Sequence, residues 1–101
     1  MGTSNLTLYG EKVIHDFGRK HPHSRKPLAR FAALVSAGQW KHFPELKQTF
    51  PAADYAPETG TVIFNIGGNK YRLVARVDFE EEILNVEALV THEEYAKEKL
   101  E

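Results

Sequence analysis

The spacing of apolar and polar residues predicts one strand and one helix at the start of the chain. Leu6 and Leu8 flank a polar residue and indicate a short strand that ends before Gly10. From Glu11 to Lys20 the apolar residues recur with helical spacing. Residues 21–24 contain a proline, which lacks the amide hydrogen that a continuing helix needs, so we expect this helix to end there.

A second helix is predicted after this break. Pro27 suits a first helical turn, and Gly38 is a plausible C-terminal cap. Between them lies an apolar stripe with helical spacing, formed by Leu28, Phe31, Ala32 and Val35. A third, partly helical piece is expected between Trp40 and Phe50, and residues 51–60 are expected to form a loop.

Beyond Thr61 the apolar pattern changes to a period of two, which predicts an antiparallel meander. Its expected strands are 62–66, 70–79 and 83–90. The first two are joined by a tight turn at Gly67–Asn69. Thr91 and Glu94 have the spacing of a capping box, which predicts a short final helix. We therefore expect an α+β fold, with the N-terminal helices packed on one face of a small antiparallel sheet and the other face free.

Composition agrees with one globular domain over residues 1–101. The chain is 42% hydrophobic and 27% charged, and two domains of half this length would each be too short to bury a core. The absence of cysteine excludes disulfides and thiolate zinc sites. No apolar run is long enough for a membrane span and no secretory signal pattern is visible, so we expect a cytoplasmic protein with no membrane association.

Charge is segregated along the chain. Residues 1–76 hold 11 Lys or Arg against 5 Asp or Glu, whereas residues 77–101 hold 2 against 9. This polarity suggests a basic surface for an anionic partner and an acidic C-terminal part that either shields this surface or points away from it. An accidental distribution of solvated charges is the alternative.

The strand at 70–79 is expected to have one apolar and one cationic face. Its odd positions are apolar, whereas Lys70, Arg72 and Arg76 share the even face. Lys supplies a point charge and Arg can grip two oxygens, so this face suits phosphates, although an ordinary solvated strand face is the alternative. The apolar face of the next strand is expected to contain Leu84, Val86, Ala88 and Val90.

His92 is the histidine with the best position for proton transfer. It would occupy the first helical position after Thr91, where the helix dipole disfavours a protonated imidazole. Strict continuation of the strand alternation would turn His92 toward the core, so a change of direction is needed to bring it to the open face. The other histidines lack metal-ligand spacing, and we expect neither a metal nor a cofactor. Trp40 fits either a core position or a surface on which a base stacks.

Three parts of the sequence together resemble the HigB group of type II toxins, which is similar to RelE. They are Trp40, the stretch from Val62 to Val74 and the stretch from Thr91 to Tyr95. The resemblance implies an endoribonuclease that cuts mRNA, usually on the ribosome. It also implies neutralisation by a HigA-like antitoxin with a helix-turn-helix domain, through which alone the toxin would contact DNA. The family commonly has Asp where this chain has Ala96, which weakens any role for an acid there.

The implied reaction is attack of an RNA 2′-hydroxyl on the adjacent phosphorus, without a metal. The resemblance gives roles to residues already singled out by their positions. Candidate catalytic residues are Arg72 and Lys70 for charge stabilisation, His92 as general acid or base, and Tyr95 as an assistant. Candidate RNA-binding residues are Arg76, Asn69 and Trp40.

Two other classes of function remain open at this point. The first is a non-catalytic RNA- or ribosome-binding module that uses the basic sheet face and cuts no bond. The second is a DNA-binding regulator, for which the sequence offers no evident helix-turn-helix pattern.

Overall fold

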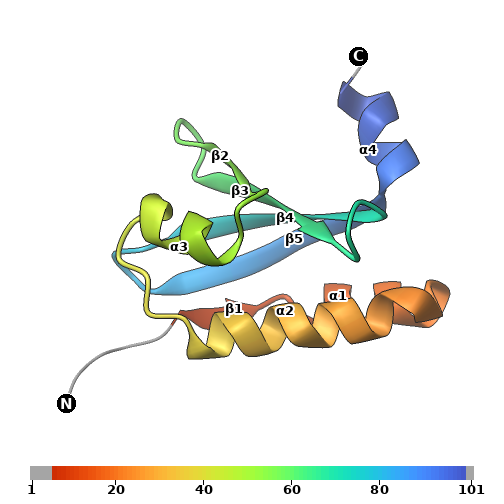
Figure 1. The fold of residues 1–101 in the computed structure, drawn as a ribbon, viewed down its shortest axis with the longest axis horizontal. Helices are drawn as coiled ribbons and strands as arrows, with labels where there is room; N and C mark the ends of the chain where they lie inside the picture. The colour runs from red at the N-terminus through yellow and green to blue at the C-terminus, as the bar shows by residue number, and fades with distance from the viewer. Residues whose placement is uncertain (1–5, 100–101) are drawn as a thin grey trace.

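The computed structural model describes residues 6–99, which form one sheet with helices on both sides of it (Figure 1). In chain order the elements are β1 (Thr7–Tyr9), α1 (Glu11–Lys20), η1 (Pro22–Ser24), α2 (Arg25–Ala37), α3 (Phe43–Thr49), β2 (Asp54–Ala56), β3 (Thr61–Ile66), β4 (Tyr71–Asp78), β5 (Ile83–Thr91) and α4 (His92–Lys99). The expected α+β class is confirmed. Among the described residues, no helix is both long enough and apolar enough to cross a membrane.

The sheet has the strand order β1-β5-β4-β3-β2. Strands β3, β4 and β5 form the predicted antiparallel meander, whereas β1 lies at one edge and pairs parallel with β5. The other edge strand, β2, falls within the expected loop 51–60, so that part of the prediction is wrong. A three-residue strand is too short to show a periodic pattern, and stacking of Tyr55 on Phe43, with ring centroids 4.7 Å apart, holds it in place.

The core lies between the sheet and the helices α1 and α2, which run along the lower side of the sheet in Figure 1. The predicted stripe of α2 provides three of its buried residues, Leu28, Phe31 and Val35. The ring of Phe31 lies 4.9 Å from that of Phe64 and 5.5 Å from that of Phe50. These aromatic contacts fix the end of α3 and strand β3 against α2.

Gly10 allows β1 to turn directly into α1. Its backbone is left-handed, with φ of 87°, and a Cβ there would lie 2.4 Å from the carbonyl oxygen of Val86 in β5. Only glycine tolerates both the conformation and the close approach. The turn therefore brings α1 across the neighbouring strand.

A β-bulge in β5 overturns one sequence expectation. Val74 pairs with Ala88 and Ala75 pairs with Val86, so Glu87 is an extra residue in β5. Beyond it the alternation is reversed: Leu89 packs against the core, whereas Ala88 and Val90 lie on the opposite face. Placing Ala88 and Val90 on the core face was wrong, because strict alternation does not allow for an inserted residue.

Helix α4 rises from the end of β5 on the side of the sheet opposite α1 and α2 (Figure 1). The predicted capping box is confirmed: Thr91 N–H donates to Glu94 Oε1 at 2.9 Å, and Glu94 N–H donates to Thr91 Oγ1 at 3.1 Å. These two bonds fix the point where the strand becomes a helix. The second face of the sheet, expected to be free, is thus covered by α4 at one end.

Candidate active site

Arg72 is at the centre of a polar cluster at the end of the sheet where α4 begins. Its Nη2 donates to Asn69 Oδ1 at 2.7 Å and lies 3.2 Å from His92 Nδ1. Its Nη1 donates to the carbonyl oxygens of Asn69 and Tyr71 at 3.3 and 3.2 Å. The ring of Tyr95 covers the guanidinium, with its centroid 5.6 Å from Cζ. We call Asn69, Arg72, His92 and Tyr95 the Arg72 cluster.

Arg72 is buried without an opposite charge. The residue is only 9% exposed, and none of the ion pairs among residues 6–99 includes it. Its partners among the described residues are neutral oxygens, a ring nitrogen and an aromatic face. Burial of a charge is costly unless an opposite charge compensates it. The cluster therefore favours an anion that fits the guanidinium fork, and phosphate has this geometry.

The bulge at Glu87 brings His92 to Arg72. Because the alternation is reversed after the bulge, Val90 lies opposite Arg72, and His92 continues the same face one step beyond Thr91. The His92 N–H donates to the Lys70 carbonyl oxygen at 2.8 Å, which extends the ladder by one bond. The change of direction that the sequence required for His92 is thus made inside β5, before the helix begins.

The contact with Arg72 determines which nitrogen of His92 is free to donate. A guanidinium has no acceptor, so Nδ1 must accept, and the neutral imidazole then carries its proton on Nε2. The imidazole itself is exposed. His92 thus combines a nitrogen held beside a cation with a second nitrogen that solvent or a ligand can reach.

The Glu94 carboxyl in the first turn of α4 is engaged in capping. Its pKa lies below its ordinary value, chiefly because it accepts the Thr91 N–H, and His21 and Lys20 act in the same direction. The lowered pKa favours the ionised carboxylate that accepts this bond.

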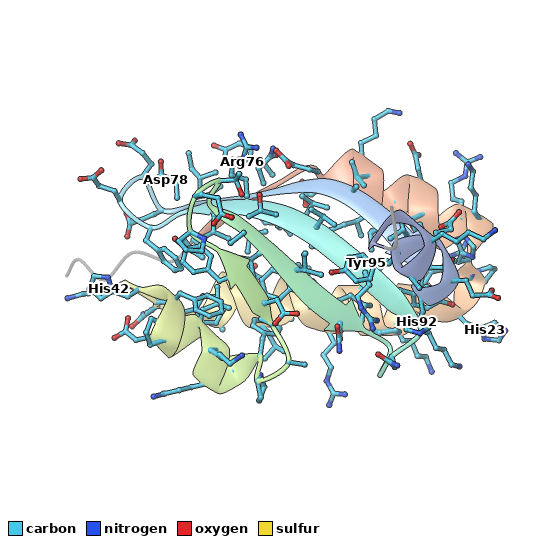
Figure 2. The ribbon with its side chains drawn as sticks, turned by 90° about the horizontal axis from the view of Figure 1, so that it is seen from above. His23, His42, Arg76, Asp78, His92 and Tyr95 are labelled. Atoms are coloured by element: carbon cyan, nitrogen blue, oxygen red, sulfur yellow. The ribbon has the colours of Figure 1, made fainter. Side chains whose placement is uncertain are left out.

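The structure separates the candidate cations on β4. Lys70 lies opposite His92 beside the cluster and is exposed. Arg76 projects from the same face as Arg72 but about 13 Å further along the strand, at about 3.3 Å per residue. Its Nε lies 3.6 Å from a carboxylate oxygen of Glu87. Figure 2 shows Arg76 and Asp78 at one end of the sheet and His92 and Tyr95 at the other.

Two further candidates have packing or positioning roles in the structure. The ring of Trp40 packs edge-on against Phe50, with centroids 5.8 Å apart, and folds over Gly38, where a Cβ would lie 2.3 Å from it. Asn69 holds the guanidinium of Arg72 through its side chain and its backbone. The sequence did not predict that Asn69 positions Arg72. The two residues are three positions apart across a tight turn, and this spacing could have indicated the contact.

Asn65, for which the sequence left the role undetermined, lies opposite Arg72 in the neighbouring strand β3. Among residues 6–99, no group of three or more His, Asp or Glu side chains is arranged to hold a metal ion.

Comparison with known proteins places these features in a family. Residues 24–98 match the family HigB_toxin, described as the RelE-like toxic component of a toxin-antitoxin system. The chain is 32% identical over 91 residues to the mRNA interferase toxin HigB of Escherichia coli (strain K12), which is 89% of this chain and 88% of that protein. The same identity and coverage hold for the mRNA interferase HigB of Escherichia coli O157:H7 and that of Shigella flexneri. The matched segment contains the whole Arg72 cluster.

Proposed function

The chain belongs to the HigB family of RelE-like toxins, and from this we propose that it inhibits translation by cutting mRNA at the Arg72 cluster. The main support is the guanidinium of Arg72, which is buried among neutral partners. Its positive charge can be compensated by a phosphate. A phosphodiester supplies the missing negative charge. In the transition state this charge increases, so the same guanidinium stabilises it more strongly.

The proposed reaction is an internal transfer within the RNA. The 2′-oxygen forms a bond to the adjacent phosphorus and gives its proton to a base. The bond from phosphorus to the 5′-oxygen breaks, and that oxygen takes up a proton. The products are a 2′,3′-cyclic phosphate and a 5′-hydroxyl end.

We assign the base to His92. Before substrate arrives, Arg72 donates to Nδ1 and occupies its lone pair. A phosphate oxygen that takes this donor frees Nδ1, which then accepts the proton of the 2′-hydroxyl. Substrate binding and activation of the base are thus the same event. Tyr95, whose ring lies over Arg72, is the candidate proton donor to the leaving oxygen, and Lys70 adds positive charge at the rim.

A toxin of this family has an antitoxin partner. We further propose that this partner is HigA-like, with a helix-turn-helix domain, so that the chain reaches DNA only through it. Cleavage on the ribosome is part of the same proposal, since the exposed cation Lys70 suits the phosphates of ribosomal RNA as well as those of mRNA.

The test is mapping of transcript ends after induction of the full chain, with Arg72→Ala, His92→Gln and an exposed control, Arg19→Gln. We expect new transcript ends and growth arrest with the wild type and the control only. Both site variants should still copurify with the antitoxin, which shows that they fold.

Two results would contradict the proposal. Full toxicity of Arg72→Ala and His92→Gln, at expression equal to the wild type, would remove the Arg72 cluster from the reaction. Growth arrest with uncut transcripts would replace the endoribonuclease with a non-catalytic RNA- or ribosome-binding module.

A further inference from the structure

A second feature lies next to the Arg72 cluster, on the open edge of β3. It is an open pocket of about 520 Å³, whose lining includes Lys26, Arg30, Leu34, Phe50, Asn65 and Gly68. Strand β2 pairs only with residues 61–63, so the rest of this edge has no neighbouring strand. Helix α2 and the end of α3 form the opposite wall. A volume of this size is in the range of small-molecule binding sites.

The pocket is cationic on one side. Lys26 and Arg30 are four residues apart on α2, so they lie on the same side of the helix, and both are exposed. Neither has an ion pair or hydrogen bond from its side chain to another residue in the described range 6–99, and the lining contains no acidic residue. Two free cations in a pocket without carboxylates favour an anionic ligand.

The other side of the pocket is apolar. Leu34 is 38% exposed, although it is a large hydrophobic residue, and Phe50 is half-buried at the end of α3. A flat aromatic ligand can pack against such a wall, as nucleobases do in single-strand binding sites. Cations beside an apolar wall match the two halves of a nucleotide.

Two residues of the pocket lining adjoin the Arg72 cluster. Asn65 lines the pocket and lies opposite Arg72 in the β3–β4 pairing. Gly68 lines the pocket and directly precedes Asn69, and a Cβ placed on Gly68 would meet nothing within 4 Å. The pocket lining therefore reaches the residues next to the cluster on both β3 and the turn.

We propose that this pocket binds a nucleotide that flanks the cleaved bond of the RNA, with its base against Leu34 and Phe50 and the adjoining phosphates on Lys26 and Arg30. The inference rests on the proposed function, because it assumes RNA at the Arg72 cluster. It adds a subsite that aligns the strand from outside the reacting atoms. Lys26 and Arg30 are therefore binding residues, and their loss should raise KM and leave kcat unchanged.

The test measures binding separately from cleavage. The probe is a labelled single-stranded RNA of 2′-O-methyl nucleotides, which lacks the attacking hydroxyl, titrated with the full chain at several salt concentrations. For Lys26→Gln/Arg30→Gln we expect about tenfold weaker binding and a salt dependence of log K that is shallower by roughly 0.7 per lost phosphate contact. The matched control, Arg19→Gln/Lys41→Gln, removes the same charge from exposed positions outside the pocket and should leave the slope unchanged.

A third variant tests the base-binding wall. Leu34→Ser removes apolar surface without changing charge, so binding should weaken while the salt dependence stays the same. Thermal unfolding of each variant should match the wild type, since all the altered side chains are exposed. A Leu34→Ser variant that binds like the wild type would overturn the position of the base.

The outcomes separate this inference from the proposed function. Equal shifts in the two double variants would overturn the subsite, because they would report net charge alone, and so would failure of the wild type to bind the probe. If the wild type still cuts transcripts in that case, the proposed function stands. Pocket-dependent binding without any cleavage would instead support the subsite and remove the endoribonuclease.

Discussion

Arg72 and Arg76 lie on the same face of β4, four residues apart, but their surroundings are opposite. Arg72 is buried under α4, has no ion pair with a carboxylate of residues 6–99, and contacts Asn69 and His92. Arg76 is exposed on the open sheet and pairs with Glu87. The pair Arg76–Glu87 is of the surface type that contributes about 0.2–1 kcal/mol to stability. Arg76 thus already has a carboxylate beside it, whereas the neighbours of Arg72 in the described chain are neutral.

The difference between the two ends of β4 comes from one inserted residue. Glu87 is the bulged residue of β5, and it lies between the two arginines. Before the bulge β5 presents Asn85 opposite Arg76, and after it Val90 lies opposite Arg72, with His92 following on that face. The bulge thus supplies the partner of Arg76 and, through the reversed alternation, the neighbour of Arg72.

His92→Ala should have the largest effect. It removes the imidazole beside Arg72, which we propose as the base. We expect RNA cleavage to fall by about 10³-fold, within the range of general acid–base catalysis. The control Glu87→Ala removes the ion-pair partner of Arg76 at the other end of the strand and should keep the activity. A His92→Ala variant as active as Glu87→Ala would show that His92 is not the base.

Arg72→Lys should have the next largest effect. Lysine keeps the positive charge but has one nitrogen, whereas Arg72 uses Nη2 for the Asn69 side chain and His92 and Nη1 for two carbonyl oxygens. We expect single-turnover cleavage to slow by about 10²-fold, in the range for loss of one oxyanion donor. The matched variant Arg76→Lys should cleave at the wild-type rate. Equal losses in the two variants would mean that the two arginines act alike.

Asn69 gives a smaller and more specific effect, because it acts through Arg72. Asn69→Ala removes the 2.7 Å acceptor and should lower kcat by about tenfold, the value of one charge-assisted hydrogen bond, with little change in KM. Asn69→Asp keeps an acceptor but adds a charge that competes with phosphate, so KM should rise instead. A rise in KM for Asn69→Ala, with kcat unchanged, would make Asn69 an RNA-binding residue rather than a positioning residue.

Arg76→Gln should have the smallest effect. The lost contact is an exposed ion pair, so the free energy of unfolding should change by at most about 1 kcal/mol and cleavage by less than about twofold. Urea unfolding and the cleavage assay measure the two quantities. A tenfold loss of cleavage would extend the substrate path along the whole of β4.

The sequence predicted the elements better than the surroundings of the site. Periodicity located α1 and the meander, and the capping box located the start of α4, because these signals are local. Alternation also placed Arg72 on the face opposite the apolar residues of β4. Alternation could not reveal the bulge, because the residues before Glu87 and those after it each still alternate. Alternation also could not reveal that Arg72 is buried, because its burial depends on the position of α4 over the sheet.

The parallel pairing of β1 with β5 determines when the sheet can be completed during synthesis. Thr7 lies beside Ile83, so β1, the first strand of the described chain, cannot pair until β5, the last strand, has been synthesised. Contacts between segments so far apart in sequence are slow to form, because a long loop must close first. The helices that follow β1 therefore leave the ribosome before the surface on which they pack exists. A nascent chain thus forms α1 and α2 before Arg72, His92 and Tyr95 have been added, so the Arg72 cluster can assemble only when β5 and α4 have been synthesised.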